Sequence, residues 1–267
     1  MKLKGFFKEM LRRIFSINAA VSYTGPFASW CEASNNASGY DTDEIFNKVS
    51  KSAYMVEKGL AKYERDGVLF HERDYDRELL AYIIAAIPSK GQVINVLDYG
   101  GGLGSTFYKN KDFFSDNCIS CEWNVIEQKR FVEFGKKNLE CENLKFCYSL
   151  KDVMFKKKFD FILFGSSIQY IQDNMEILTE CMSLGAKYIC LNKTPIGIGS
   201  IIVERVKEPI YNAQYPMEIF EEDTLLKVFE TNGYVLIDKW LSRNACPVYI
   251  RNKLVANYLD LIFKKYE

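Results

Sequence analysis

Apolar positions in the last two thirds of the chain switch repeatedly between short continuous runs and helical spacing. Short runs rich in β-branched and aromatic residues predict buried strands, and the amphipathic stretches between them, such as Phe131–Leu139, predict helices. This alternation requires right-handed crossovers and a parallel sheet, with ligands at the carboxyl ends of the strands. The predicted strands are Val93–Leu97, Ser120–Glu127, Leu144–Tyr148, Phe159–Phe164 and Tyr188–Leu191.

Beyond residue 200 the pattern predicts an excursion from the sheet, one helix and a closing hairpin. The excursion covers residues 201–206 and 209–216. The helix Glu222–Thr231 ends at Asn232-Gly233, which is a C-terminal stop signal. The segments Tyr234–Leu241 and Pro247–Ile250 then predict a hairpin. Residues 91–267 therefore predict an α/β domain with a mostly parallel sheet.

Residues 1–90 predict a cap or lid of helices that precedes the sheet domain. Residues 1–17 form a basic amphipathic pattern, which suits contact with an anionic membrane surface, with a partner or with the protein's own domain. Residues 18–40 predict an irregular segment in which Tyr23 and Trp30 either bind substrate as part of a lid or strap the core. Two further helices are expected, one that follows N-cap residues at Asp41–Asp43 and one that begins at about Asp74 and stops before Pro88.

Composition narrows the class of protein. The 267 residues include 35 basic and 35 acidic side chains, so the formal net charge is zero and no overall attraction to nucleic acid is expected. No apolar run is long enough to span a bilayer and the start lacks a signal-peptide pattern, which predicts a cytoplasmic protein, at the inner face of the membrane if residues 1–17 bind lipid. The eight cysteines are scattered along the chain, which is typical of reduced thiols in a cytoplasmic protein. Cys118 and Cys121 flank the start of a strand, so we expect no metal site there.

The first predicted strand runs into a glycine turn that is the main candidate ligand site. The run ends at Asp98 and continues into Gly100, Gly101, Gly102 and Gly104 before a polar helix start at Ser105. A strand, a glycine-rich turn and a helix N-terminus bring backbone close to a nucleotide-like ligand. The spacing is D-x-G-x-G-x-G and not the G-x-G-x-x-G of nicotinamide sites, because Ser105 stands three positions after Gly102. A strained turn without a ligand is disfavoured, since one turn rarely needs four glycines.

Two further strand ends supply polar groups. Glu127 ends the second strand, where a carboxylate can accept hydrogen bonds from two ribose hydroxyls, with Gln128 beside it; the alternative is a solvated acid. The fourth strand ends at Ser166, Ser167, Gln169 and Tyr170. These side chains either face a reacting group at the sheet edge or cap the next helix.

Together these residues resemble the class I S-adenosylmethionine (SAM) methyltransferases over about residues 91–255. The resemblance implies their Rossmann-like, seven-stranded sheet, SAM as cofactor with S-adenosylhomocysteine (SAH) as product, and Gly100, Gly102, Gly104 and Glu127 as cofactor contacts. We add Asp98, Gly101, Gln128, Ser166 and Ser167 to the expected cofactor site.

A narrower resemblance covers nearly the whole chain. The segments Tyr23–Trp30, Gly39-Tyr40, Arg65-Asp66, Asp98–Gly104, Trp123–Gln128, Ser166–Tyr170 and Tyr215–Phe220 are similar to methyltransferases encoded in bacterial capsule and O-antigen gene clusters. That family implies activity on surface-polysaccharide material without fixing the acceptor.

We therefore expect a SAM-dependent O-methyltransferase acting on a sugar, a nucleotide-linked sugar or a phosphoryl group. A hydroxyl acceptor needs a base, and histidine is a residue type suited to that role near neutral pH, which makes His71, the one histidine, a catalytic candidate. Tyr170 is the second catalytic candidate, with Asp66 and Asp74 as rivals, while an anionic phosphoryl acceptor would need no base. The alternative is a catalytically silent SAM-binding or scaffold protein. A nucleic-acid methyltransferase is disfavoured by the neutral charge and by GSSIQY at the fourth strand end, which lacks a proline-aromatic motif.

Overall fold

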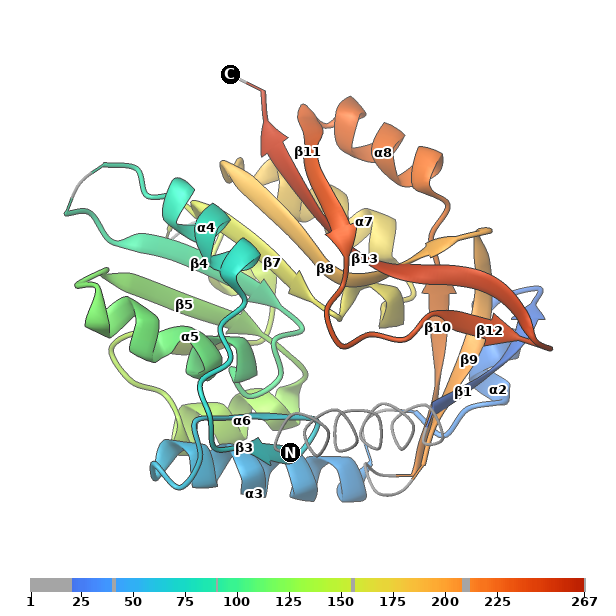
Figure 1. The fold of residues 1–267 in the computed structure, drawn as a ribbon, viewed down its shortest axis with the longest axis horizontal. Helices are drawn as coiled ribbons and strands as arrows, with labels where there is room; N and C mark the ends of the chain where they lie inside the picture. The colour runs from blue at the N-terminus through green and yellow to red at the C-terminus, as the bar shows by residue number, and fades with distance from the viewer. Residues whose placement is uncertain (1–20, 40–41, 90, 155–156, 208–211, 267) are drawn as a thin grey trace, which may run out of the picture.

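An eight-stranded sheet, seven strands of which follow one another in a continuous path, forms the centre of the computed structural model, which describes residues 21–39, 42–89, 91–154, 157–207 and 212–266. Its strand order is β6-β5-β4-β7-β8-β13-β11, and the short β12 (Val248–Ile250) pairs with β13 off this path (Figure 1). The first five strands are parallel, and β13 is antiparallel to both neighbours. The seven are β4 (Ile94–Tyr99), β5 (Cys121–Ile126), β6 (Leu144–Cys147), β7 (Phe161–Gly165), β8 (Tyr188–Gly197), β11 (Tyr234–Leu241) and β13 (Lys253–Lys265).

The order of the parallel strands determines where a ligand can enter. The chain runs outward from β4 to β5 and β6, then returns to β7 on the other side of β4 and continues to β8. Strand order therefore reverses between β4 and β7. In open α/β sheets ligands bind outside the carboxyl ends of the strands at such a switch point. The predicted Rossmann-like, mostly parallel α/β sheet is confirmed, and its carboxyl edge is the place to look for the site.

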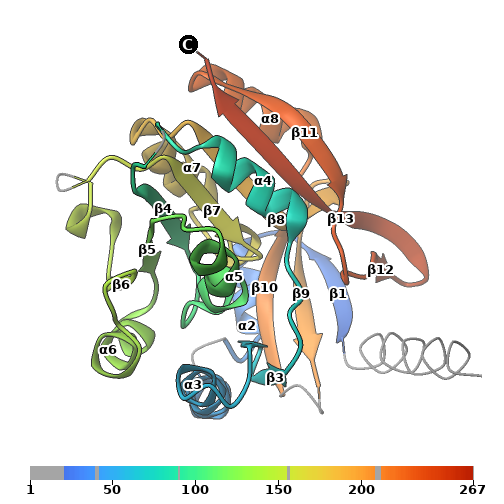
Figure 2. The same ribbon diagram turned by 60° about the vertical axis from the view of Figure 1, so that its left-hand side comes forward.

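Alternate residues of the central strands pack into two hydrophobic cores, one on each face of the sheet. Val96, Phe161 and Leu163 pack on one face, while Leu97 and Ile162 pack on the other. Both faces are covered by helices, so these strands are continuous apolar runs. The first face carries α4 (Arg77–Ala85), α5 (Ser105–Asp116) and α6 (Lys129–Asn138), and the second carries α7 (Asn174–Ser183) and α8 (Glu222–Thr231) (Figure 2).

A second, three-stranded sheet joins the N-terminal region to the excursion after β8. Its β1 (Val21–Phe27) pairs antiparallel with β9 (Ser200–Val206), which pairs with β10 (Ala213–Ile219). The prediction that residues 18–40 are irregular was wrong for the described part, which forms β1 and then α2 (Trp30–Asn35). Gly25-Pro26 looks like a loop signal, but β1 is an edge strand with a register shift there, where proline is tolerated.

The cap predicted for residues 1–90 is only partly helical. After α3 (Asp43–Glu57), a hairpin of β2 (Tyr63–Arg65) and β3 (Val68–Phe70) leads to α4. Strand pairing between β1 and β9 crosses the predicted boundary at residue 90. Residues 1–17 lie outside the described residues, so their predicted membrane contact stays a prediction. In the part of the chain that is described, no helix has the length and apolar character needed to cross a bilayer.

The predicted closing hairpin was also wrong. Strand β11 pairs with β13, and β12 forms the hairpin with β13 through Arg251 and Asn252, both at positive φ. The sequence pattern predicts no element for residues 253–265. Their long strand alternates at first and then becomes continuously apolar from Leu261 to Phe263, because there it is covered on both faces.

Candidate functional site

The glycine turn that follows β4 is open at Gly102 and closely packed at its other glycines. Gly100, Gly102 and Gly104 have φ values of 72°, 59° and 81°, and α5 begins directly afterwards. A Cβ added at Gly101 would lie 2.5 Å from Cγ of Asp98, so a side chain there collides with the buried acid. At Gly102 a Cβ would meet no atom within 4 Å. The turn is therefore tight underneath and open above, as a backbone cradle for a ligand must be.

Asp98 supports the turn from below. Its side chain is fully buried, and Oδ2 accepts a hydrogen bond from Nε1 of Trp123 at 2.9 Å. The other carboxyl oxygen, Oδ1, has no hydrogen-bond partner among the described residues. Burial raises the pKa of Asp98 to about 7, and the Glu127 charge adds to the rise while the Trp123 hydrogen bond opposes it. The enclosed carboxyl therefore supports the glycine turn from beneath.

Glu127 lies beside the open part of the turn. It follows β5, and its carboxylate accepts hydrogen bonds from the backbone N–H of Gly102 at 3.2 Å and from that of Gln128 at 2.9 Å. These two bonds hold the acid between the glycine turn and the start of α6. A partly exposed carboxylate fixed in this position can accept hydrogen bonds from vicinal hydroxyls. Gln128 is exposed and is the N-terminal flanking residue of α6.

The two serines after β7 connect neighbouring strand ends. Oγ of Ser167 donates to the carbonyl of Tyr99 at 2.5 Å, and a Cβ at Gly100 would lie 2.5 Å from Cβ of Ser167. Ser167 thus ties the end of β7 to the start of the glycine turn, and its side chain does not cap the following 3₁₀ turn. Ser166 has a positive φ of 61° and its N–H donates to the carbonyl of Asn192 in β8.

Lys193 was missed by sequence reasoning. It follows Asn192 in β8 at a φ of 51°, and its N–H donates to Oδ1 of Asp260 at 2.7 Å. Burial lowers the pKa of the Lys193 ammonium to about 8, and the nearby charges of Arg65 and Lys109 add to this. The predicted strand stops at Leu191, so the residues just after it, NKTP, occupy the place where α/β sites lie.

A buried glutamate surrounded by tyrosines lies where the small sheet meets the end of β7. Oε2 of Glu204, on β9, accepts a hydrogen bond from the hydroxyl of Tyr170 at 2.6 Å, and Oε1 accepts one from Tyr23 at 3.5 Å. The hydroxyls of Tyr23 and Tyr258 are 3.4 Å apart. Burial raises the pKa of Glu204 to about 7, opposed by the Tyr170 hydrogen bond and assisted by the charge of Asp66. The structure thus brings together Tyr23 and Tyr170, two of the predicted site residues.

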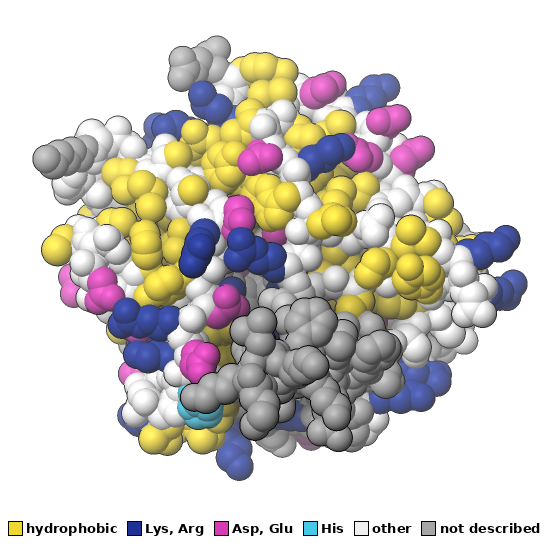
Figure 3. Space-filling view, viewed as in Figure 1, with side chains coloured by type: hydrophobic (Ala, Val, Ile, Leu, Met, Phe, Trp, Pro, Cys, Tyr) yellow, Lys and Arg dark blue, Asp and Glu magenta, His cyan; other side chains and the backbone are white. Residues whose placement is uncertain are grey.

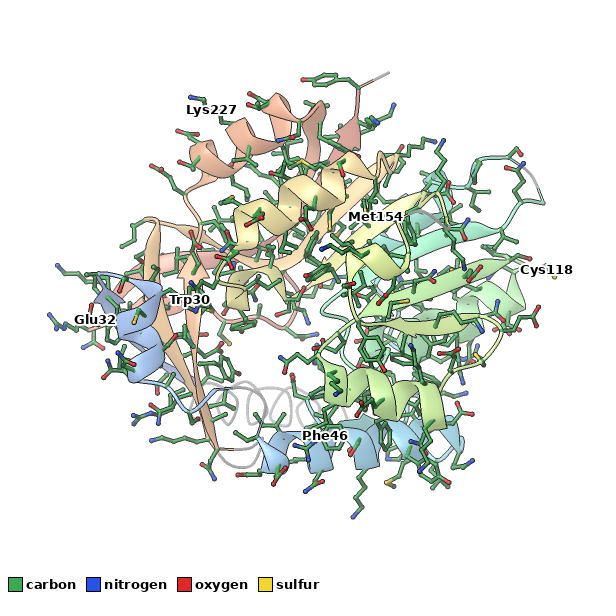
Figure 4. The ribbon with its side chains drawn as sticks, turned by 180° about the vertical axis from the view of Figure 1, so that it is seen from behind. Trp30, Glu32, Phe46, Cys118, Met154 and Lys227 are labelled. Atoms are coloured by element: carbon green, nitrogen blue, oxygen red, sulfur yellow. The ribbon has the colours of Figure 1, made fainter. Side chains whose placement is uncertain are left out.

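The other two candidates from the sequence do not join this group. His71 is exposed after β3 and has no hydrogen bond or ion pair to another described residue; its side chain is at the surface in Figure 3. Trp30 begins α2, which packs on β9 and β10 (Figure 4). The catalytic role of His71 and the substrate role of Trp30 stay predictions.

Replacing Glu204 by glutamine is expected to change how stability depends on pH. Burial raises the carboxyl pKa from 4.5 to about 7, so the folded protein keeps a proton that the unfolded chain releases. The wild type therefore loses stability as pH rises through this window, and Glu204→Gln does not. From pH 5.5 to pH 8, the unfolding free energy of Glu204→Gln minus that of the wild type should increase by about 2 kcal/mol.

Denaturant unfolding at the two pH values measures this drift. The exposed Glu230→Gln on α8 is the control and should show none. A constant difference between wild type and Glu204→Gln at both pH values would contradict the burial of this carboxyl.

Comparisons with known proteins support the fold. No protein-family model matches the chain, and no curated protein sequence matches it. Among solved structures, a LepI variant in complex with SAH and a substrate analogue is 9% identical over 91% of this chain and 60% of its own, with a TM-score of 0.51. The CcbJ methyltransferase from Streptomyces caelestis is 9% identical over 82% of this chain and 99% of its own, with a TM-score of 0.48.

A third similar structure is magnesium protoporphyrin IX methyltransferase from Synechocystis PCC 6803 with bound SAH. It is 12% identical over 71% of this chain and 81% of its own, with a TM-score of 0.45. Several of the similar structures are SAM-dependent methyltransferases. At this identity the likeness to the LepI variant concerns the fold alone, and the chain itself has a Rossmann-like α/β fold.

Proposed function

We propose that this protein is a SAM-dependent methyltransferase. The observation that carries the proposal is the glycine turn, open at Gly102, with the Glu127 carboxylate fixed beside it by two backbone N–H groups. This arrangement fits SAM, because the backbone of the turn can approach the cofactor without a Cβ and Glu127 can accept hydrogen bonds from its ribose. Residues 100–104, Glu127 and Gln128 would hold the cofactor, with Asp98 supporting the turn and Ser166 at the neighbouring strand end.

Bound SAM supplies a methyl group on a sulfonium, which is already activated for displacement by a nucleophile. The protein's own task is to align the acceptor with that methyl group and to exclude water. Ser167 contributes by fixing the end of β7 against the end of β4. In this proposal the small sheet and the β2–β3 hairpin would enclose the acceptor.

For a hydroxyl acceptor we propose that Tyr170 and Glu204 carry the proton away. The acceptor O–H would donate its proton to the Tyr170 oxygen as Tyr170 passes its own proton to Oε2 of Glu204, 2.6 Å away. The carboxyl pKa of about 7 suits this role near neutral pH. The exposed His71 is the competing candidate for the base, and the His71→Ala variant tests it.

We further propose that the acceptor is a sugar, a nucleotide-linked sugar or a phosphoryl group made in the cytoplasm for a surface polysaccharide. The support for this part is the resemblance of segments such as Arg65-Asp66 and Tyr215–Phe220 to methyltransferases of capsule and O-antigen gene clusters. Membrane contact through residues 1–17 is part of the same proposal.

The experiment is a methyl-transfer assay that follows SAH release, with sugars, sugar phosphates and sugar nucleotides as acceptors. We expect SAH release only with an acceptor that also gains a methyl group by mass spectrometry. Folded protein that binds SAM but methylates no member of the panel would instead support a catalytically silent SAM-binding protein.

A further inference from the structure

We infer that the cavity between the β2–β3 hairpin, α5 and the end of β8 binds a phosphate group of the methyl acceptor. Four cationic side chains line this cavity, from the hairpin, α5, β8 and the loop after β11: Arg65, Lys109, Lys193 and Arg243. In Figure 3, Lys and Arg side chains mixed with Asp and Glu gather near the middle of the face shown. Its role as an acceptor site rests on the proposed function, whereas its affinity for phosphate does not.

Lys193 is the centre of the argument. Its backbone is fixed at positive φ by the bond from its N–H to Asp260 and by the bond its carbonyl accepts from Gln169. The side chain is mostly buried, yet among the described residues its ammonium has no hydrogen bond or ion pair. A largely buried cation without a hydrogen-bond or ion-pair partner is costly even with the charges of Asp66 and Asp260 nearby, and an anion entering the cavity would lower that cost.

Arg65 is the second cation without a carboxylate partner among the described residues. Its guanidinium lies over the ring of Phe70, 5.4 Å from the centroid. A planar guanidinium and a point-charge ammonium facing one cavity are the pair of groups that phosphate recognition commonly uses. Lys109 and Arg243 lie at the same cavity, and their charges lower the pKa values of their neighbours, as groups that repel one another do.

The three carboxylates lining the cavity each have a partner within or next to its walls. Asp260 accepts hydrogen bonds from Ser242 and from the N–H of Lys193. Asp76 caps the N-terminus of α4. Asp74 accepts from the hydroxyl of Tyr63 and lies 3.8 Å from Lys109. These acids hold the walls in place, so Arg65 and Lys193 are left to meet an anion.

The cavity adjoins the proposed cofactor site on two sides. Glu64, one residue before Arg65, is hydrogen-bonded to Ser105 at the start of α5, directly after the glycine turn. Asn192, one residue before Lys193, is bonded to Ser166 at the end of β7. A phosphate held by Arg65 and Lys193 would therefore hold its sugar at the carboxyl edge of the sheet, near Tyr170. The acceptor class that fits is a sugar phosphate or a nucleotide-linked sugar.

The test is calorimetric titration of the SAH-saturated protein with glucose 1-phosphate, inorganic pyrophosphate and uncharged glucose. We expect saturable binding of at least one phosphorylated probe, weakened about 10- to 100-fold in Lys193→Met and in Arg65→Gln. Uncharged glucose should bind the wild type no more tightly than it binds these variants. The control is Lys227→Met, an exposed lysine on α8 that does not line the cavity, and this variant should bind like the wild type (Figure 4).

Two further titrations with the phosphorylated probes separate this inference from the proposed function. One uses the wild type without SAH, and the other uses Glu127→Ala. Phosphate affinity should stay within about threefold in both, because neither change touches the cavity. The absence of saturable phosphate binding by folded wild type, or equal binding by Lys193→Met, Arg65→Gln and wild type, would overturn the inference.

Discussion

Replacing Gly101 by alanine is expected to weaken the binding of SAM and SAH by at least about 100-fold. The new Cβ would lie 2.5 Å from Cγ of Asp98 and 2.6 Å from its Oδ2, and the acid is too tightly enclosed to move. The glycine turn must therefore shift, and this shift displaces the backbone N–H groups beside Gly101. Displaced N–H donors lose most of their contribution to the binding of SAM and SAH. The stability cost of such overpacking is about 1–3 kcal/mol.

Gly233→Ala is the matched control for this prediction. Gly233 has a positive φ of 81° after α8, with no atom within 4 Å of an added Cβ. That substitution should cost about 1 kcal/mol of stability through backbone strain while leaving SAM affinity unchanged. Calorimetry and denaturant unfolding of both variants measure the two effects separately. Gly101→Ala protein that binds SAH within threefold of wild type would show that the turn does not hold the cofactor.

Replacing Tyr170 by phenylalanine is expected to lower kcat for a hydroxyl acceptor by about 10²–10³-fold. The change removes the hydroxyl that donates to Glu204 and leaves the ring, which packs edge-on against Tyr215. The KM for SAM should stay the same because Tyr170 does not belong to the glycine turn. In the wild type, kcat should rise with pH through about 7 as Glu204 loses its proton, and this limb should vanish in Glu204→Gln.

Two variants separate this proton path from other causes. Tyr249→Phe, on the exposed part of β12, controls for loss of a tyrosine hydroxyl and should keep full activity. His71→Ala should also keep activity if Glu204 receives the proton. Tyr170→Phe with kcat and pH profile like the wild type, together with loss of activity in His71→Ala, would move the base to His71.

The sheet was predictable because both of its faces are buried. Strands such as Phe161–Gly165 are continuously apolar, and the glycine turn carries its own spacing, so the fold class and the position of the proposed cofactor site followed from local sequence. The small sheet was not predictable in this way. Strand β1 is stabilised by β9, almost 180 residues later, and its Gly-Pro pair conceals the strand.

The proposed acceptor site depends on the same long-range contacts. Glu204 and Lys193 carry no motif, and each acquires its unusual environment only when distant segments surround it. The sequence suggests Tyr23 as an exposed aromatic of a lid, yet the structure places it beside Glu204 because β1 and β9 pair in that register. His71, a candidate because it is the one histidine of the chain, lies exposed at the end of a hairpin.

The central claim is that the glycine turn and Glu127 bind SAM, and calorimetric titration with SAM and SAH tests it most directly. We predict micromolar affinity for the wild type, weakened about tenfold or more in Glu127→Ala, with the exposed Glu230→Ala unchanged. Folded wild-type protein that binds neither SAM nor SAH, or Glu127→Ala that binds them as tightly as the wild type, would contradict the account.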